Sequence, residues 1–195
     1  PPEPPNAADM KYPTGQTGPA PESNFDAASN VDMGSPVVND DVAAFNSGMS
    51  RTESGGRYDI VNDEGFSGKY QFGQPRLDDF NRANGSNFKT SDLVAGTPQS
   101  RKLTEQVQNW HVGDIDKDLS DLVGKPVNGQ PMSLNALRAM AHLGGKGGAR
   151  KYVETGGKYN PSDSNGTSLS DYARTHGQMG TQQQGGSAPQ QGRIS

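Results

Sequence analysis

The chain has 195 residues, of which 29% are hydrophobic and 21% charged, with a mean hydropathy of −0.87 and a formal net charge of −4. It contains no cysteine, which excludes disulfides, thiol catalysis and thiolate metal sites. The negative charge argues against a general nucleic-acid binder, because such proteins present a basic face to the phosphates. No apolar run approaches the roughly 20 residues that a membrane-spanning helix needs, so we expect no membrane span.

Composition divides the chain into three parts. Eight of the 14 prolines lie before residue 37, where large apolar side chains are too few to bury a core, so we expect an extended arm or linker over residues 1–37. Residues 177–195 hold six glutamines, five glycines and no aromatic residue, which predicts a flexible tail or linker. Residues 38–176 hold most of the large apolar side chains, including the only tryptophan, and are predicted to form a single domain.

The periodicity of this domain is helical wherever it is clear. Two aspartates at the start and a glycine pair beyond the end delimit a first helix within residues 40–54. A proline in the first turn and a glycine after the last turn delimit a second helix within residues 75–84. The longest amphipathic pattern, with a period of about 3.6, follows Pro98 and runs to residue 123.

The second half of the domain continues the helical pattern. Ser133 caps an Ala- and Leu-rich run over residues 134–141, which we expect to be the buried central helix, and the glycines at 144, 145, 147 and 148 are predicted to stop it. Two short helices are expected over residues 149–154 and 169–174. Residues 58–72 are Gly-spaced and aromatic, which predicts a loop or a small hairpin. The predicted fold class is therefore mostly α.

The sequence offers no recognisable metal or cofactor motif. Its three histidines, at 111, 142 and 176, are too scattered for a known pattern of metal ligands, and we expect them to be surface or hydrogen-bonded buried residues. Asp114, Asp116, Asp118 and Asp121 lie on the long predicted helix without the spacing of an EF-hand, so we interpret them as a solvated face. We expect neither a metal nor another cofactor.

One segment, over residues 50–73, carries candidate chemistry. Glu53 lies at the end of an apolar helix and near aromatic residues, where apolar surroundings disfavour the charged carboxylate and so preserve a general acid. The glycines at 65 and 68 leave room for a flat sugar ring beside the backbone. Gln71 offers both a donor and an acceptor to a hydroxyl or acetamido group. The alternative is that Glu53 is an ordinary charge at a helix end.

Glu53-Ser54 is followed, after a short loop, by Gly65-Phe66-Ser67-Gly68-Lys69-Tyr70-Gln71-Phe72. This order resembles the lytic transglycosylase branch of the lysozyme-like superfamily, which carries Glu-Ser at a helix end and then Gly-Ala-x-Gly-x-x-Gln with an aromatic or aliphatic residue. A later family motif, Ala-Tyr-Asn-x-Gly, is similar to residues 141–145, where His142 replaces the Tyr and Leu143 the Asn. A final family Tyr corresponds to Tyr172. The resemblance covers residues 40–176.

The resemblance implies a mostly helical, lysozyme-like fold that cleaves the β-1,4 bond between N-acetylmuramic acid and N-acetylglucosamine in peptidoglycan. In this family a single Glu protonates the glycosidic oxygen and then deprotonates the muramyl 6-hydroxyl, which closes a 1,6-anhydro ring without a metal. The catalytic residue implied here is Glu53. The implied substrate contacts, with Tyr70 and Gln71 lining the sugar groove beside the backbone of 65–68, are Ser54, Gly65, Ser67, Gly68, Tyr70, Gln71, His142 and Tyr172.

Two alternatives stay open. A hydrolytic muramidase on the same fold needs a second carboxylate about 5–9.5 Å from the first, and Asp59, Asp63 and Glu64 are candidates by proximity in the sequence. A catalytically inactive phage tail component or glycan-binding protein on the same fold is favoured by the replacements at His142 and Leu143.

A wall-cutting domain between a proline-rich arm and a Gln/Gly-rich tail suggests delivery by a larger machine. The compact segment Gly68-Lys69-Tyr70-Gln71-Phe72-Gly73 most resembles domains of phage virion proteins that open the cell wall during genome entry. We therefore expect a phage tail or internal virion protein that acts in the bacterial cell wall or periplasm. Its expected partners are peptidoglycan glycan strands and, through the arms, other virion proteins, with no nucleic-acid partner. Residues 38–176 are expected to fold and to cleave glycan without the arms.

Overall fold

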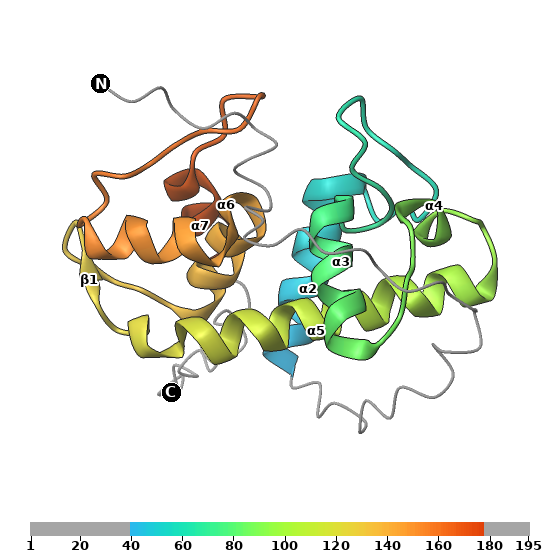
Figure 1. The fold of residues 1–195 in the computed structure, drawn as a ribbon. Helices are drawn as coiled ribbons and strands as arrows, with labels where there is room; N and C mark the ends of the chain where they lie inside the picture. Colours follow the sequence, from blue (N-terminus) through green and yellow to red (C-terminus); the bar gives the residue numbers. More distant parts are fainter. Residues whose placement is uncertain (1–39, 178–195) are drawn as a thin grey trace, which may run out of the picture.

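The computed structural model describes residues 40–177, so the expected arm over 1–37 and nearly all of the expected tail over 177–195 lie outside the described residues. The described part is mostly helical, as predicted (Figure 1). Its elements in chain order are α2 (Asp40–Ser54), α3 (Gln74–Asn84), α4 (Thr90–Leu93), α5 (Pro98–Leu119), the 3₁₀ turn η2 (Ser120–Leu122), β1 (Pro126–Val127), β2 (Gln130–Pro131), α6 (Leu134–Glu154) and α7 (Leu169–His176).

Three of the helices begin at a short polar residue that the sequence provides. α5 follows Thr97 and has Pro98 in its first turn. α6 follows Ser133, and α7 follows Ser168. In each case the hydroxyl oxygen accepts a hydrogen bond from a backbone N–H of the first turn, at 3.0–3.2 Å. These side chains satisfy donors that the start of a helix leaves open, so the boundaries are set locally.

The long helix α5 runs along one side of the described part and connects its two halves (Figure 1). α4 packs on the first half of α5, α3 packs just past its middle and α6 packs on its second half, while α7 packs against both α6 and α2. Each helix contributes at least one fully buried apolar side chain to the core between them. Representatives in chain order are Phe45, Leu77, Leu93, Val107, Leu137 and Leu169.

In the acidic run of α5 and η2, Asp118 and Asp121 are exposed, as expected of a solvated face, whereas Asp114 and Asp116 are only 23% and 29% exposed. All four carboxylates are paired with basic side chains from α3 and α6. The pairs are Asp114–Arg76, Asp114–Lys146, Asp116–Arg138, Asp118–Lys146 and Asp121–Arg150. The side chains of Arg76 and Arg138 are only 7% and 2% exposed, so these two ion pairs lie inside the fold and tie α3 and α6 to α5. The sequence could not show this because the basic partners lie on other elements.

Helix α6 consists of two helical stretches that meet at a kink at Gly145, so the glycines interrupt the helix as the sequence predicted. Gly145 has φ 74° and ψ 166°, a backbone conformation that residues with a Cβ atom adopt only with strain. Helical turns resume directly after it, so the predicted short helix over residues 149–154 is the second half of α6. Just before the bend, a Cβ atom on Gly144 would lie 2.7 Å from Leu169 Cδ2, so this glycine lets α7 approach α6 closely.

Two of the non-helical segments contain short β pairings. β1 and β2 form an antiparallel hairpin, with Pro126 opposite Pro131, that the sequence analysis did not predict. Residues 58–72 form the predicted loop, in which isolated bridges join Ser67 to both Val61 and Phe72. This loop matters for the site because it leads from the end of α2 to the start of α3.

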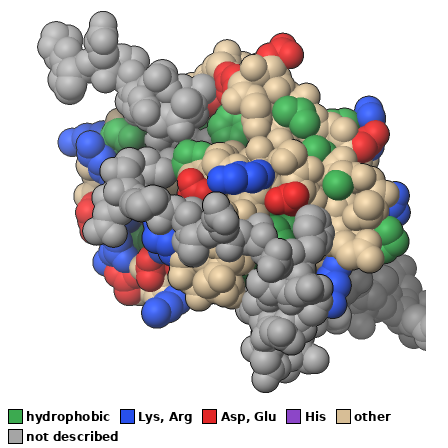
Figure 2. Space-filling model, turned by 45° about the vertical axis from the view of Figure 1, so that its right-hand side comes forward, with side chains coloured by type: hydrophobic (Ala, Val, Ile, Leu, Met, Phe, Trp, Pro, Cys, Tyr) green, Lys and Arg blue, Asp and Glu red, His purple; other side chains and the backbone are tan. Residues whose placement is uncertain are grey.

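The surface of the described part carries both signs of charge. On the face that Figure 2 shows, acidic and basic side chains lie interspersed. This face therefore lacks, among the described residues, the continuous basic patch that attracts a phosphate backbone. Over residues 40–177, none of the helices has the length and apolar character needed to traverse a membrane.

Candidate active site

Glu53 lies in the last turn of α2, immediately before the glycines that end the helix. Its side chain is only 5% exposed. The carboxyl oxygen Oε1 accepts a hydrogen bond from the Tyr172 hydroxyl of α7 at 2.7 Å and lies 3.4 Å from Nε2 of His142 on α6. Side chains of two further helices therefore hold this nearly buried carboxyl group in place.

A cleft of about 410 Å³ opens over this carboxyl group. It is lined by α2, by α7 and by two loops, which project from the same side of the described part in Figure 1. Polar groups face it from both loops and from both helices. They include Glu53, Asn62, Gln71, Asp163, Thr167 and Tyr172. A polar cleft of this volume lies in the usual range of ligand sites.

The two loops that wall the cleft contain the same turn, in the sequences Asn-Asp-Glu-Gly-Phe and Asp-Ser-Asn-Gly-Thr. In each, Oδ1 of the first residue, Asn62 or Asp163, accepts hydrogen bonds from the backbone N–H groups two and four residues later, at 2.8–3.0 Å. Each has glycine at its fourth position, Gly65 or Gly166, with φ of 85° or 82°. Internal hydrogen bonds of this kind stiffen both walls.

Three of the predicted site residues line the cleft: Glu53, Gln71 and Tyr172. Gln71 is 3% exposed, and its side-chain Nε2 donates a hydrogen bond to the backbone oxygen of Gly68 at 2.8 Å. Its backbone has φ 51°, so the residue is held in an uncommon conformation at the edge of the cleft. Tyr172 reaches the cleft from α7 and joins its two helical walls through the bond to Glu53.

Ser54, Gly65, Ser67 and Gly68 do not line this cleft, and their assignment as substrate contacts stays a prediction. They shape the loop beside it. Ser54 Oγ donates a hydrogen bond to the backbone oxygen of residue 69 at 2.8 Å, and Ser67 exchanges two backbone hydrogen bonds with Phe72 at 2.9 and 3.0 Å. The motif that connects these residues in the sequence therefore builds a wall, and only its Glu and Gln reach the cleft.

Tyr70 also differs from the prediction, because its side chain lies in the core. The residue is 1% exposed, and its hydroxyl donates a hydrogen bond to Glu105 Oε2 at 2.9 Å. Burial, together with the neighbouring Glu105 carboxylate, raises the pKa of the Tyr70 hydroxyl. Lys69 and Tyr58 donate to the other oxygen of Glu105, each at 2.6 Å. The cluster anchors the loop to α5 and does not face the cleft.

The predicted contact residue His142 lies behind Glu53 and does not line the cleft. It is 1% exposed, and its Nδ1 lies 3.2 Å from Nε2 of His111, which is 2% exposed. The third histidine, His176, is fully buried and lies in the lining of the cleft. Burial, and secondarily the nearby His142, lowers the pKa of His176 to about 4, while Glu53 acts in the opposite direction. All three histidines are thus buried. The sequence had left open whether they lie on the surface or are buried and hydrogen-bonded.

The second wall of the cleft was missed by the sequence analysis. Asp163 and Thr167 lie more than a hundred residues from Glu53, and the chain folds back to the site only through the packing of α7 against α2 and α6. A usable signal existed: both walls begin with Asn or Asp and have glycine three residues later, the pattern of an Asx turn.

Comparison with family models, with curated proteins and with solved structures finds no match to this chain. Over residues 40–177, no three side chains of His, Asp or Glu are grouped so as to hold a metal ion. The chemistry of the site is that of a shielded carboxyl group, a phenol that donates to it, and a polar cleft with two stiff walls.

Proposed function

We propose that this chain is a lytic transglycosylase of the lysozyme-like type, which cleaves the β-1,4 bond between N-acetylmuramic acid and N-acetylglucosamine in peptidoglycan. One observation carries the proposal: Glu53, with 5% of its side chain exposed, lines a polar cleft and accepts a hydrogen bond from Tyr172. A general acid needs a carboxyl group that is fixed near the scissile bond and shielded from bulk water. The resemblance of residues 53–72 to the family motif supports the same assignment.

The proposed reaction uses Glu53 twice. First, its carboxyl group gives a proton to the glycosidic oxygen as the bond from that oxygen to C1 of the muramyl residue breaks. The resulting carboxylate keeps the hydrogen bond from Tyr172. It then takes the proton of the muramyl 6-hydroxyl as that oxygen attacks C1 and closes the 1,6-anhydro ring. The nucleophile is already tethered to the reacting sugar, so no water has to be positioned.

The walls of the cleft suit a glycan strand. Sugar rings present hydroxyl and acetamido groups, which hydrogen-bond to amides, hydroxyls and carboxylates. Asn62 and Gln71 line the cleft from one loop, and Asp163 and Thr167 line it from the other. Because both turns are internally hydrogen-bonded, little ordering of the walls is needed when a strand binds.

A hydrolytic muramidase is the second candidate, and a specific observation favours it. Among the described residues, Asp163 is the other carboxylate that lines the cleft with Glu53, whereas Asp59, Asp63 and Glu64 do not line it. The Asp163→Asn variant separates the two reactions, because Asn62 makes the same turn with an amide oxygen. A transglycosylase keeps its rate in this variant, whereas a hydrolase that uses Asp163 as base or nucleophile loses about 10²–10⁴-fold.

The proposal is tested by peptidoglycan zymography with the wild type, Glu53→Gln and the matched variant Glu64→Gln. Glu64 is exposed on the neighbouring loop and does not line the cleft. We expect clearing by the wild type and by Glu64→Gln, and a loss of about 10²–10⁴-fold or more in Glu53→Gln with glycan binding retained. Clearing by Glu53→Gln at the wild-type rate contradicts the assignment. Glycan binding without clearing by the wild type supports the inactive glycan-binding alternative.

We also propose that the chain acts from a phage virion, where it opens the host cell wall during genome entry. The support is the resemblance of residues 68–73 to a segment of wall-cutting domains in virion proteins, together with the proline-rich composition of residues 1–37. Mass spectrometry of purified virions tests this, and finding the chain only in lysates of infected cells contradicts it.

A further inference from the structure

Four side chains from four different helices form a continuous row behind the cleft. Arg76 Nε on α3 donates a hydrogen bond to Nδ1 of His111 on α5 at 2.9 Å. Nε2 of His111 lies 3.2 Å from Nδ1 of His142 on α6, and Nε2 of His142 lies 3.4 Å from Glu53 Oε1 on α2. All four side chains are buried or nearly so, with Arg76 the most exposed at 7%.

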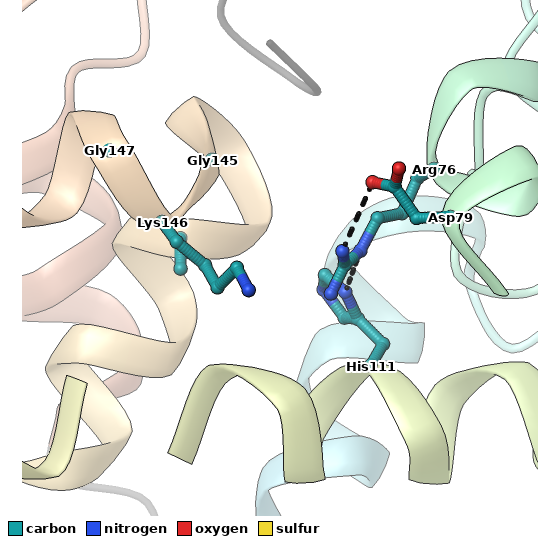
Figure 3. Close-up of a pocket in the computed structure, with 7 residues that line it drawn as sticks. Arg76, Asp79, His111, Gly145, Lys146 and Gly147 are labelled. Carbon is teal, nitrogen blue, oxygen red and sulfur yellow. Dashed lines mark hydrogen bonds and ion pairs between the residues drawn. The ribbon is translucent and has the colours of Figure 1, made fainter. Parts of the chain in front are cut away.

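Arg76, at the far end of this row, is rigidly held. Its other guanidinium nitrogens bind Asp79 at 3.3 Å and Asp114 at 2.6 Å, and its guanidinium carbon lies 4.3 Å from the centre of the Trp110 ring. Figure 3 shows the guanidinium between Asp79 and the ring of His111, beside a cavity of about 130 Å³. Such a clamp leaves Nε one direction in which to point, toward His111.

The imidazole rings are fixed as well. The Phe72 ring packs edge-on against both, with ring centres 5.3 Å from His111 and 6.0 Å from His142. Burial, together with the charge of Arg76, lowers the pKa of His111 well below its ordinary value. His111 is therefore a neutral ring with a single N–H at neutral pH.

The donors and acceptors along the row can be arranged in only one way. A guanidinium has no acceptor, so Nδ1 of His111 must accept from Arg76 and the ring proton of His111 must be on Nε2. That N–H donates to Nδ1 of His142. Because Nδ1 of His142 accepts this bond, the ring proton of His142 must be on Nε2, which lies 3.4 Å from Glu53 Oε1, slightly farther than an ordinary hydrogen bond.

We infer that Arg76 is a positioning residue for Glu53: through His111 it fixes both imidazoles as Nε2–H tautomers, so that His142 presents an N–H to Glu53 Oε1. Tyr172 donates to the same oxygen, so the acid proton of Glu53 is carried by the other oxygen, Oε2. The same two donors stabilise the carboxylate that forms when this proton is given away. The effect on catalysis rests on the proposed function. The assignment of the tautomers is independent of that function.

The test is a long-range ¹H–¹⁵N correlation spectrum of the full chain labelled with ¹⁵N-histidine, recorded at pH 7. The chain has three histidines, and single His→Gln variants assign them. We expect both His111 and His142 to show the pattern of a neutral ring with its proton on Nε2. A proton on Nδ1 of either ring overturns the inference, and this result needs no variant of Arg76 and no activity.

Two variants extend the test to catalysis. Arg76→Met removes the donors, and we expect an Nδ1–H form of His111 to appear and kcat on peptidoglycan fragments to fall about tenfold to a hundredfold, with KM within about twofold. Arg138→Met is the matched control, because Arg138 is also a buried arginine with two carboxylate partners but does not contact the histidines. We expect it to lower thermal stability while leaving tautomers and kcat unchanged. Equal losses of kcat in the two variants overturn the positioning role.

The failure of this inference is distinguishable from the failure of the proposed function. If the wild-type chain shows the expected spectrum but does not cleave peptidoglycan, the proposed function is refuted and the assigned tautomers stand. If cleavage depends on Glu53 but the proton of His111 is on Nδ1, the inference is refuted and the proposed function stands.

Discussion

Acidification should destabilise the described part through His176, in a range of pH where few other groups titrate. The residue is fully buried, its ring packs against Tyr172 with centres 5.3 Å apart, and its Nε2 lies 3.4 Å from Thr52 Oγ1. Burial, and secondarily His142, lowers its pKa from an ordinary 6.5 to about 4. Protonation is therefore more favourable in the unfolded chain than in the folded one.

The sign and size of the effect follow from proton linkage. A lowered histidine pKa means that the stabilisation is fully present above pH 6.5 and is lost as the pH falls from 6.5 to about 4. At 1.36 kcal/mol per unit, the full loss is about 3 kcal/mol, of which about 2 kcal/mol occurs between pH 7 and pH 5. His111, whose pKa is also lowered by burial, acts in the same direction. Asp171, whose pKa is lowered to about 2, loses its contribution only below its ordinary 3.8.

Urea unfolding of the wild type and of His176→Gln at pH 7 and pH 5 measures this contribution. We expect the free energy of unfolding to fall in both proteins, because His111 remains, but by about 2 kcal/mol less in the variant. Equal losses in the two proteins, or no loss in the wild type, would refute the reasoning.

Three further substitutions test other parts of the account by urea unfolding and by cleavage. Gly145→Ala should lower the free energy of unfolding by about 1–3 kcal/mol, because a residue with a Cβ atom is strained at φ 74°. Gly148→Ala, whose Cβ atom would lie in open space on the same helix, should raise it by up to about 1 kcal/mol. Equal effects of the two substitutions would contradict the role of the kink at Gly145. Glu105→Gln should lower the free energy of unfolding by about 1–2 kcal/mol and speed proteolysis within residues 58–72, because it weakens three hydrogen bonds that hold this loop to α5. An unchanged rate of proteolysis would show that Glu105 does not anchor the loop. Tyr172→Phe should lower kcat about tenfold with a smaller change in KM, and an unchanged kcat would show that its bond to Glu53 has no part in the reaction.

The helix boundaries that the sequence predicted are those set by local chemistry. Thr97 with Pro98, and Ser133, supply the caps of α5 and α6, and their effect reaches only one turn along the chain. The interruption of α6 is local too, because Gly145, with φ 74°, breaks the helix within the predicted run of glycines. The close approach of Gly144 to Leu169 of α7 was not predictable, because it depends on how the two helices pack.

The candidate site was predictable only where its residues lie close together in the sequence. Glu53 and Gln71 lie in one short segment, so a motif can identify them together. The position of Asp163 and the row from Arg76 to His142 depend on how four helices pack, and no local spacing encodes that arrangement. Tyr70 was assigned to the groove because motifs give order along the chain and not the direction of a side chain.

The central claim, that Glu53 alone serves as acid and base in a non-hydrolytic cleavage, is tested most directly by the mass of the products. Peptidoglycan is digested with the wild type and with Glu53→Gln, and the released muropeptides are analysed by mass spectrometry. The account predicts 1,6-anhydro-muramyl ends, lighter by one water than hydrolysed ends, from the wild type and almost none from the variant. Predominantly reducing muramyl ends from the wild type would contradict the claim and identify a hydrolase.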